Sequence, residues 1–125
     1  MIRRIIVAAI AASCSLTACV GTERQSAAQT APLAIDETAT YEYLIPYGTS
    51  VAIDRGQTVD LMPASLDARV GESIRIVNRD TRGYMVGPFY VASQQTVAMR
   101  FTQPGTLSGT CDMSAAGEIV ITVTA

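Results

Sequence analysis

The sequence predicts an all-β sandwich from about Thr40 to the C-terminus, on three observations. Apolar and polar residues alternate from Thr40 onward, which is the period of a half-buried strand. Turn-forming residues recur every several positions, as they do in sandwiches and barrels. No helical period of useful length follows the N-terminal segment. We therefore expect a single small domain in which one sheet packs on another.

The expected strands are short. They cover residues 41–46, 50–54, 57–62, 65–70, 73–77, 84–91, 95–102, 106–110 and 118–124. Arg55-Gly56 is a plausible tight turn between the second and third strands, and Gly71-Glu72 is the turn before the fifth. Gly87-Pro88 interrupts residues 84–91, which favours an edge or a bend at that point. In the last strand, alternate residues from Ile119 to Val123 are expected on the buried face.

The N-terminus has the pattern of an export signal. Arg3 and Arg4 precede a short apolar run, residues 5–12, which is too short to span a bilayer. Leu16-Thr17-Ala18-Cys19 then resembles the lipobox of bacterial lipoproteins. The resemblance implies a signal peptide over residues 1–18 and a diacylglycerol on Cys19. It also implies a protein anchored through lipid on the extracytoplasmic side of a membrane of the bacterial cell envelope. The alternative is an ordinary cleaved secretion signal.

Residues 19–39 are rich in Ala, Thr, Gln and Ser and have no apolar period. This composition predicts a flexible tether, so the folded domain is expected to cover residues 40–125.

Composition excludes some functions. The chain has 9 arginines and no lysine, a net charge of −2 and no basic cluster after the N-terminus, so we expect no nucleic-acid binding. It has no histidine and hence no obvious general base, and no enzymatic activity is expected. The acidic residues Asp54, Asp60, Asp67 and Asp80 stand in or beside predicted turns and are expected to be solvated.

Cys111 is the one cysteine of the predicted domain, because Cys14 leaves with the signal and Cys19 would carry lipid. It therefore has no partner for an internal disulfide. Its loop, residues 109–117, also contains Met113. A thiolate beside a thioether is a soft ligand pair suited to copper.

Three stretches resemble the cupredoxins, the small β-sandwiches that carry copper for electron transfer: residues 69–80, 83–89 and 101–111. The resemblance implies a cupredoxin-like Greek-key β-sandwich, with Cys111 at the position of the thiolate ligand. The family's first histidine falls at Tyr84 and its second at or near Ser114, so both imidazole positions are vacated. No methionine follows Met113, so the usual axial thioether is absent too. These departures argue against blue-copper electron transfer, which needs a thiolate and two imidazoles.

Three hypotheses remain. In the first, the domain binds no metal and is a non-catalytic binding or interaction module, with an envelope protein as one conceivable partner. In the second, Cys111, Met113 and Met85 bind Cu(I), and the protein stores or carries copper. In the third, Cys111 is an exposed, redox-responsive thiol. The expected cofactor is accordingly none, or copper.

Overall fold

The computed structural model describes residues 27–125. The predicted signal peptide and the predicted lipidation site Cys19 lie outside these residues. Within residues 27–125 no helix is long and apolar enough to cross a membrane.

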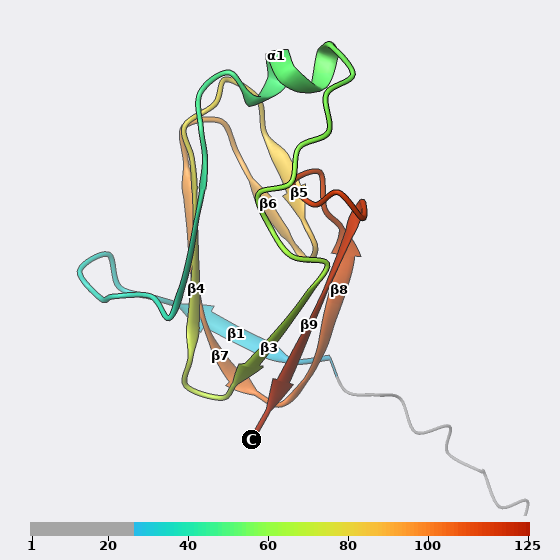
Figure 1. The fold of residues 1–125 in the computed structure, drawn as a ribbon. Helices are drawn as coiled ribbons and strands as arrows, with labels where there is room; N and C mark the ends of the chain where they lie inside the picture. The colour runs from blue at the N-terminus through green and yellow to red at the C-terminus, as the bar shows by residue number, and fades with distance from the viewer. Residues whose placement is uncertain (1–26) are drawn as a thin grey trace, which may run out of the picture.

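Two sheets and a hairpin form the domain (Figure 1). The four-stranded sheet has the order β1 (Gln29–Pro32), β7 (Thr96–Gln103), β4 (Ser73–Asn78), β2 (Tyr41–Ile45). The three-stranded sheet has the order β3 (Ser65–Arg69), β9 (Glu118–Thr124), β8 (Gly105–Thr110). A hairpin of β5 (Tyr84–Val86) and β6 (Phe89–Val91) lies beside them. The predicted all-β Greek-key sandwich is confirmed.

The strand pairing places the alternating apolar residues of the sequence between the two sheets. β2 runs parallel to β4, and β3 runs parallel to β9, whereas the other pairs are antiparallel. Along β4 and β9 the alternate residues Ile74, Ile76, Ile119 and Ile121 are fully buried. Phe101 from β7 is fully buried with them, so the core lies between the two sheets.

The predicted boundary of the tether is wrong. Ala28 and Leu33 are buried, and β1 pairs with the edge of β7. The backbone N–H of Leu33 also donates to the carbonyl of Ala98 at 3.0 Å. The folded domain thus includes residues 28–39. Pro32 is tolerated because β1 is an edge strand that does not need every N–H for pairing.

Two predicted strands are also wrong. Residues 50–54 belong to a short helix, α1 (Thr49–Asp54), and residues 57–62 form no strand. Alternation over five residues does not distinguish a strand from one helical turn when the segment packs at the end of a sandwich. Gly48 stands at the N-cap of α1 and has no side chain to cap it. The cap comes from another part of the chain, as described below.

Candidate functional site

The loop that follows β8 is fastened to the β5–β6 hairpin by backbone pairing. Cys111 forms an isolated antiparallel bridge with Val86. The N–H of Asp112 donates to the carbonyl of Met85 at 3.1 Å, and the N–H of Gly87 donates to the carbonyl of Thr110 at 2.8 Å. The segments that carry Tyr84 and Cys111 therefore lie side by side, as the resemblance implied.

Close approach of the two segments depends on glycine. A Cβ atom at Gly109 would lie 2.7 Å from the carbonyl oxygen of Gly87, well inside van der Waals contact. Gly87 itself has a positive φ of 58°, which a side chain would strain. These two glycines set the position of Cys111 relative to β5.

Cys111 and Met113 point into the core. Both side chains have a relative exposure of 0%. Burial raises the pKa of the Cys111 thiol, and the charge of Asp112 raises it further, although N–H groups of Met113 and Ser114 act to lower it. The hypothesis of an exposed, redox-responsive thiol is therefore wrong, because such a thiol has to be accessible and readily ionised.

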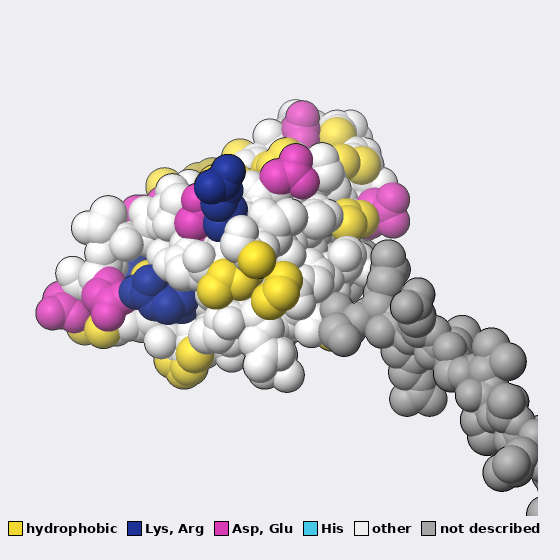
Figure 2. All heavy atoms as spheres, turned by 90° about the horizontal axis from the view of Figure 1, so that it is seen from below, with side chains coloured by type: hydrophobic (Ala, Val, Ile, Leu, Met, Phe, Trp, Pro, Cys, Tyr) yellow, Lys and Arg dark blue, Asp and Glu magenta, His cyan; other side chains and the backbone are white. Residues whose placement is uncertain are grey.

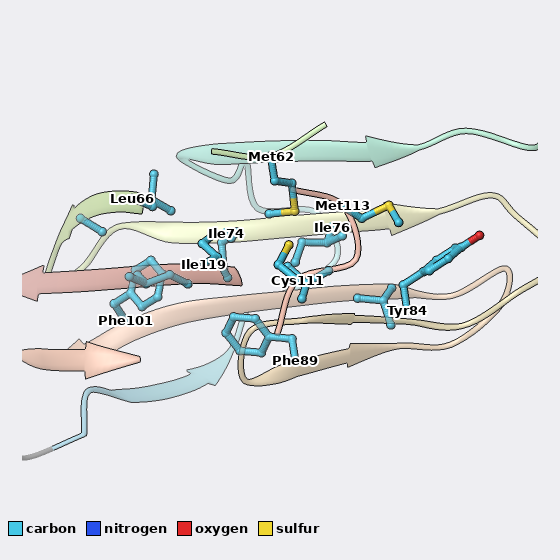
Figure 3. Close-up of a cluster of buried hydrophobic side chains, with 14 of the residues drawn as sticks. Met62, Leu66, Ile74, Ile76, Tyr84, Phe89, Phe101, Cys111, Met113 and Ile119 are labelled. Atoms are coloured by element: carbon cyan, nitrogen blue, oxygen red, sulfur yellow. The ribbon is translucent and has the colours of Figure 1, made fainter. Parts of the chain in front are cut away.

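Met62 is a third buried sulfur in the same region. The N–H groups of Leu61 and Met62 both donate to the carbonyl of Met113, at 2.8 and 3.0 Å. Met62 is 3% exposed, and Figure 3 shows the sulfur of Cys111 directed toward it. The sequence analysis did not single out Met62, because nothing in the sequence joins residue 62 to residue 113.

Met85 lies on the opposite face of β5. The burial of this strand alternates, with Tyr84 and Val86 buried and Met85 39% exposed. Successive side chains of a strand point to opposite faces of the sheet. The structure thus does not bring Met85 together with Cys111 and Met113, and the predicted three-residue set is wrong in this member.

Tyr84, at the first vacated imidazole position, is committed to another partner. Its ring is buried, and its hydroxyl donates to the Oδ2 atom of Asp80 at 2.5 Å. Burial raises the pKa of Tyr84, the hydrogen bond to Asp80 and the charge of that carboxylate raise it further, and the result is about 12. The phenol is therefore held as a neutral donor.

Asp80 is fully buried, which corrects the prediction that it is solvated. Its carboxylate also accepts the N–H of Ser50 at 2.7 Å and the N–H of Gly48 at 3.1 Å. It thereby caps α1, where Gly48 offers no side chain. We call Asp80, Tyr84, Ser50 and Gly48 the carboxylate cluster.

The pKa of Asp80 reflects two opposed effects. Burial acts to raise this pKa, because an apolar surrounding disfavours the charged form. The hydrogen bond from Tyr84 and those from backbone N–H groups outweigh it and lower the pKa from 3.8 to about 2. The carboxylate is thus ionised at neutral pH, and no buried side-chain nitrogen or oxygen of the described residues lacks a partner.

Ser114, at the second vacated position, is 7% exposed and borders a cleft of about 400 Å³. Its Oγ atom accepts the N–H of Ala116 at 3.3 Å. The cleft lies between the start of β5, the loop after β8 and the segment that follows α1. Tyr84 and Ser114, the two vacated ligand positions, both line it.

The residues present do not fit a blue-copper centre. The chain has no histidine, and the described residues contain no group of three or more His, Cys, Asp or Glu side chains arranged to hold a metal. The Tyr84 hydroxyl already donates a hydrogen bond to Asp80, and a serine hydroxyl is a poor ligand for copper at neutral pH. The buried donors that remain around Cys111 in the described part of the chain are sulfurs, and they suit Cu(I) rather than Cu(II).

Comparisons with known proteins bear on the fold. No family model and no curated protein matches the chain. Solved structures similar to it are cupredoxins, the family that the sequence resembles. A mutant of amicyanin with Cu(I) is 16% identical, with 78% of this chain and 99% of that chain covered and a TM-score of 0.44. Amicyanin from Paracoccus versutus is 14% identical, with 70% and 85% covered and a TM-score of 0.44. A purple cupredoxin from Nitrosopumilus maritimus is 16% identical, with 66% and 98% covered and a TM-score of 0.43. At these identities and TM-scores, function has to be argued from this chain's own residues.

Proposed function

We propose that this chain is a non-catalytic binding module, anchored by lipid on the extracytoplasmic side of a bacterial envelope membrane, and that it forms no blue-copper centre. The observation that carries the last part, the absence of a blue-copper centre, is the hydrogen bond of 2.5 Å from the Tyr84 hydroxyl to the buried Asp80 carboxylate. To bind copper as a phenolate, Tyr84 would have to lose a proton whose pKa is about 12. It would also leave Asp80 without its closest donor.

Absorption after loading with Cu(II) tests this part of the proposal. The purified protein is expected to show no intense visible charge-transfer band, because a thiolate without imidazole gives no trigonal blue site. The double variant Tyr84→His, Ser114→His is the matched positive control, since it places imidazoles at the two vacated ligand positions. An intense blue colour in the unmodified protein contradicts the proposal.

The membrane attachment is proposed to depend on Cys19. Figure 2 views the described residues from the end opposite α1 and shows apolar, acidic and basic groups interspersed on that face. A continuous apolar or basic surface for binding a bilayer is not visible there. Lipid on Cys19 would supply the affinity instead, through buried methylene groups.

Lipid on Cys19 would also determine which end of the sandwich lies near the membrane. The described chain begins at the end of the sandwich opposite α1, whereas the cleft lies at the α1 end (Figure 1). Cys19 and Ala27 are eight positions apart in the sequence, a length of chain that spans at most about 30 Å when fully extended. With lipid on Cys19, the cleft would then lie at the end of the sandwich away from the point of attachment, where soluble or envelope-bound partners can reach it.

Mass spectrometry of the membrane-extracted protein tests the anchor. A diacylglycerol on Cys19 as the first residue is expected, and Cys19→Ser is expected to release the protein from the membrane fraction. A mature chain that lacks lipid, or a Cys19→Ser variant that stays with the membrane, contradicts this part.

A second candidate function is the binding of Cu(I), which the sulfur-rich part of the core favours. Cys111 and Met113 are fully buried, and Met62 is joined to Met113 through the backbone. Thiolate and thioether donors suit Cu(I). In this candidate function Met62 takes the place that the sequence analysis gave to Met85.

Competition against a coloured Cu(I) chelator under reducing conditions distinguishes a site of Cys111, Met113 and Met62 from a site of Cys111, Met113 and Met85. Cys111→Ser is expected to abolish Cu(I) binding and Met113→Leu to weaken it. Met62→Leu should weaken it as well, whereas Met85→Leu, an exposed control, should not. Equal affinity in the unmodified protein and in Cys111→Ser rules the candidate function out.

A further inference from the structure

The cleft beside Tyr84 and Ser114 offers a built surface for a small ligand. Its volume of about 400 Å³ lies in the range of small-molecule sites. Three separate segments contribute to it, and each is fixed by contacts of its own. The helix α1 is capped by Asp80, the start of β5 is held through Tyr84, and the Cys111 loop is pinned at Met113.

Of the two charged side chains that line the cleft, only one is free to meet a ligand. Among residues 27–125, Arg82 is the one lining cation, and both of its terminal nitrogens already contact the carboxylate of Asp54, at 2.9 to 3.1 Å. Asp112 is the one lining anion in the same part of the chain. Its Oδ2 atom accepts the N–H of Met85 at 3.2 Å, and its Oδ1 atom has no hydrogen-bond partner among the described residues. The charge that remains available to a ligand is therefore negative.

The rest of the lining is partly apolar and partly hydroxylic. Ile53 and Val59 contribute aliphatic surface, and Thr58 and Ser114 contribute hydroxyl groups. A ligand that fits this surface carries a positive charge for Asp112 and a short aliphatic stem for the apolar wall. Hydroxyl groups at the rim can accept hydrogen bonds from an ammonium group.

We propose that the cleft binds a primary amine on a short aliphatic stem, with the ammonium group at the carboxylate of Asp112. This inference rests on the proposed function as a binding module and names its ligand class. The amine can belong to a free small molecule or to the lysine side chain of a peptide. Both sources present the same ammonium group and methylene stem.

Titration of the full chain, labelled with ¹⁵N and followed by NMR, tests the proposal. The probes are 1,4-diaminobutane as a free amine, Nα-acetyl-lysine amide as a peptide-borne amine, and acetate as an anion. Saturable shifts of the amides of Gly83, Ser114 and Gly117 with either amine support the proposal, and the tighter probe identifies the source. Binding of acetate alone would instead assign recognition to Arg82 and overturns the proposal, as does no shift with either amine.

Three variants sharpen the test. Asp112→Asn keeps an acceptor for the N–H of Met85 but removes the charge, and it should weaken amine binding about fivefold, the upper range for an exposed ion pair. Arg82→Gln releases Asp54 from its partner and should strengthen binding. Asp67→Asn, an exposed carboxylate on β3 outside the cleft lining, should leave it unchanged. Equal affinity in Asp112→Asn and the unmodified protein overturns the proposal, whereas the Cu(II) measurement above decides the proposed function separately.

Discussion

Two buried regions at the loop end of the sandwich are held together in contrasting ways. The carboxylate cluster places an ionised group, Asp80, in a site with no solvent exposure and surrounds it with donors. The sulfur region around Cys111, Met113 and Met62 is equally buried but relies on packing. The two regions correspond to the first imidazole position and the thiolate position that the resemblance implies.

The contrast indicates which part of the site tolerates change. A buried charge is stable only while its donors are present, so each member of the carboxylate cluster depends on the others. A packed thiol or thioether interacts weakly with many neighbours, and an apolar substitution of similar size disturbs it little. We therefore expect the carboxylate cluster to be sensitive to single substitutions and the sulfur region to be tolerant.

Asp80→Asn is expected to have the largest effect, a loss of about 3 kcal/mol in the free energy of unfolding. The amide carries one acceptor oxygen, and its NH₂ group would face the donors of Gly48, Ser50 and Tyr84. Urea denaturation measures the loss. Asp67→Asn, which alters an exposed carboxylate on β3, is the matched control and should change stability by less than about 0.5 kcal/mol. Equal stability of the two variants would show that the buried carboxylate is not required.

Tyr84→Phe is expected to cost less, about 2 kcal/mol, because a single donor to the charged carboxylate is lost while Gly48 and Ser50 remain. The ring itself stays buried. Urea denaturation measures this effect, and Tyr90→Phe is the control, since Tyr90 is 61% exposed. A Tyr84→Phe variant as stable as Tyr90→Phe argues that the bond of 2.5 Å contributes nothing to stability.

The sequence predicts the regions that alternation defines and fails where distant partners decide. Ile74, Ile76, Ile119 and Ile121 follow a period of two, and their strands are found to within a residue or two. The strand at Gln29–Pro32 has no such period, and it forms because the edge of β7 offers it a partner. Its pairing residues lie about 70 positions away, beyond any local pattern.

The same reasoning applies to the candidate site. The loop with Cys111 and its approach to residues 84–86 are predictable from the resemblance. The burial of Asp80 is not predictable in this way, because its donors at Gly48 and Ser50 lie about 30 residues earlier, just before and at the start of a segment whose alternation predicted a strand. The available signal in the sequence was Asp80 in or beside a predicted turn with Tyr84 four residues later, and this signal is weak.

Lowering the pH should reduce the contribution of the carboxylate cluster to the free energy of unfolding, but not that of the sulfur region. The pKa of Asp80 is lowered from 3.8 to about 2 in the folded state. A lowered pKa contributes stability above the unfolded pKa, and this contribution is lost as the pH falls through the folded one. We expect the unmodified protein to lose at most about 2 kcal/mol more than Asp80→Asn between pH 4 and pH 2. Parallel loss in both proteins contradicts the assignment of this effect to Asp80.

Cys111→Ala, in the sulfur region, should have the smallest effect on the free energy of unfolding. Cys111→Ala removes one buried sulfur and is expected to cost about 1 kcal/mol, because the site loses a small apolar group and gains no unpaired polar one. Cys111→Ser keeps the size but buries a hydroxyl. Its free energy of unfolding should be about 1 kcal/mol lower than that of the alanine variant. Urea denaturation of both variants, without copper, gives the order. If serine proves as stable as alanine or more so, the hydroxyl has found a partner, and the region around Cys111 is more polar than packing alone explains.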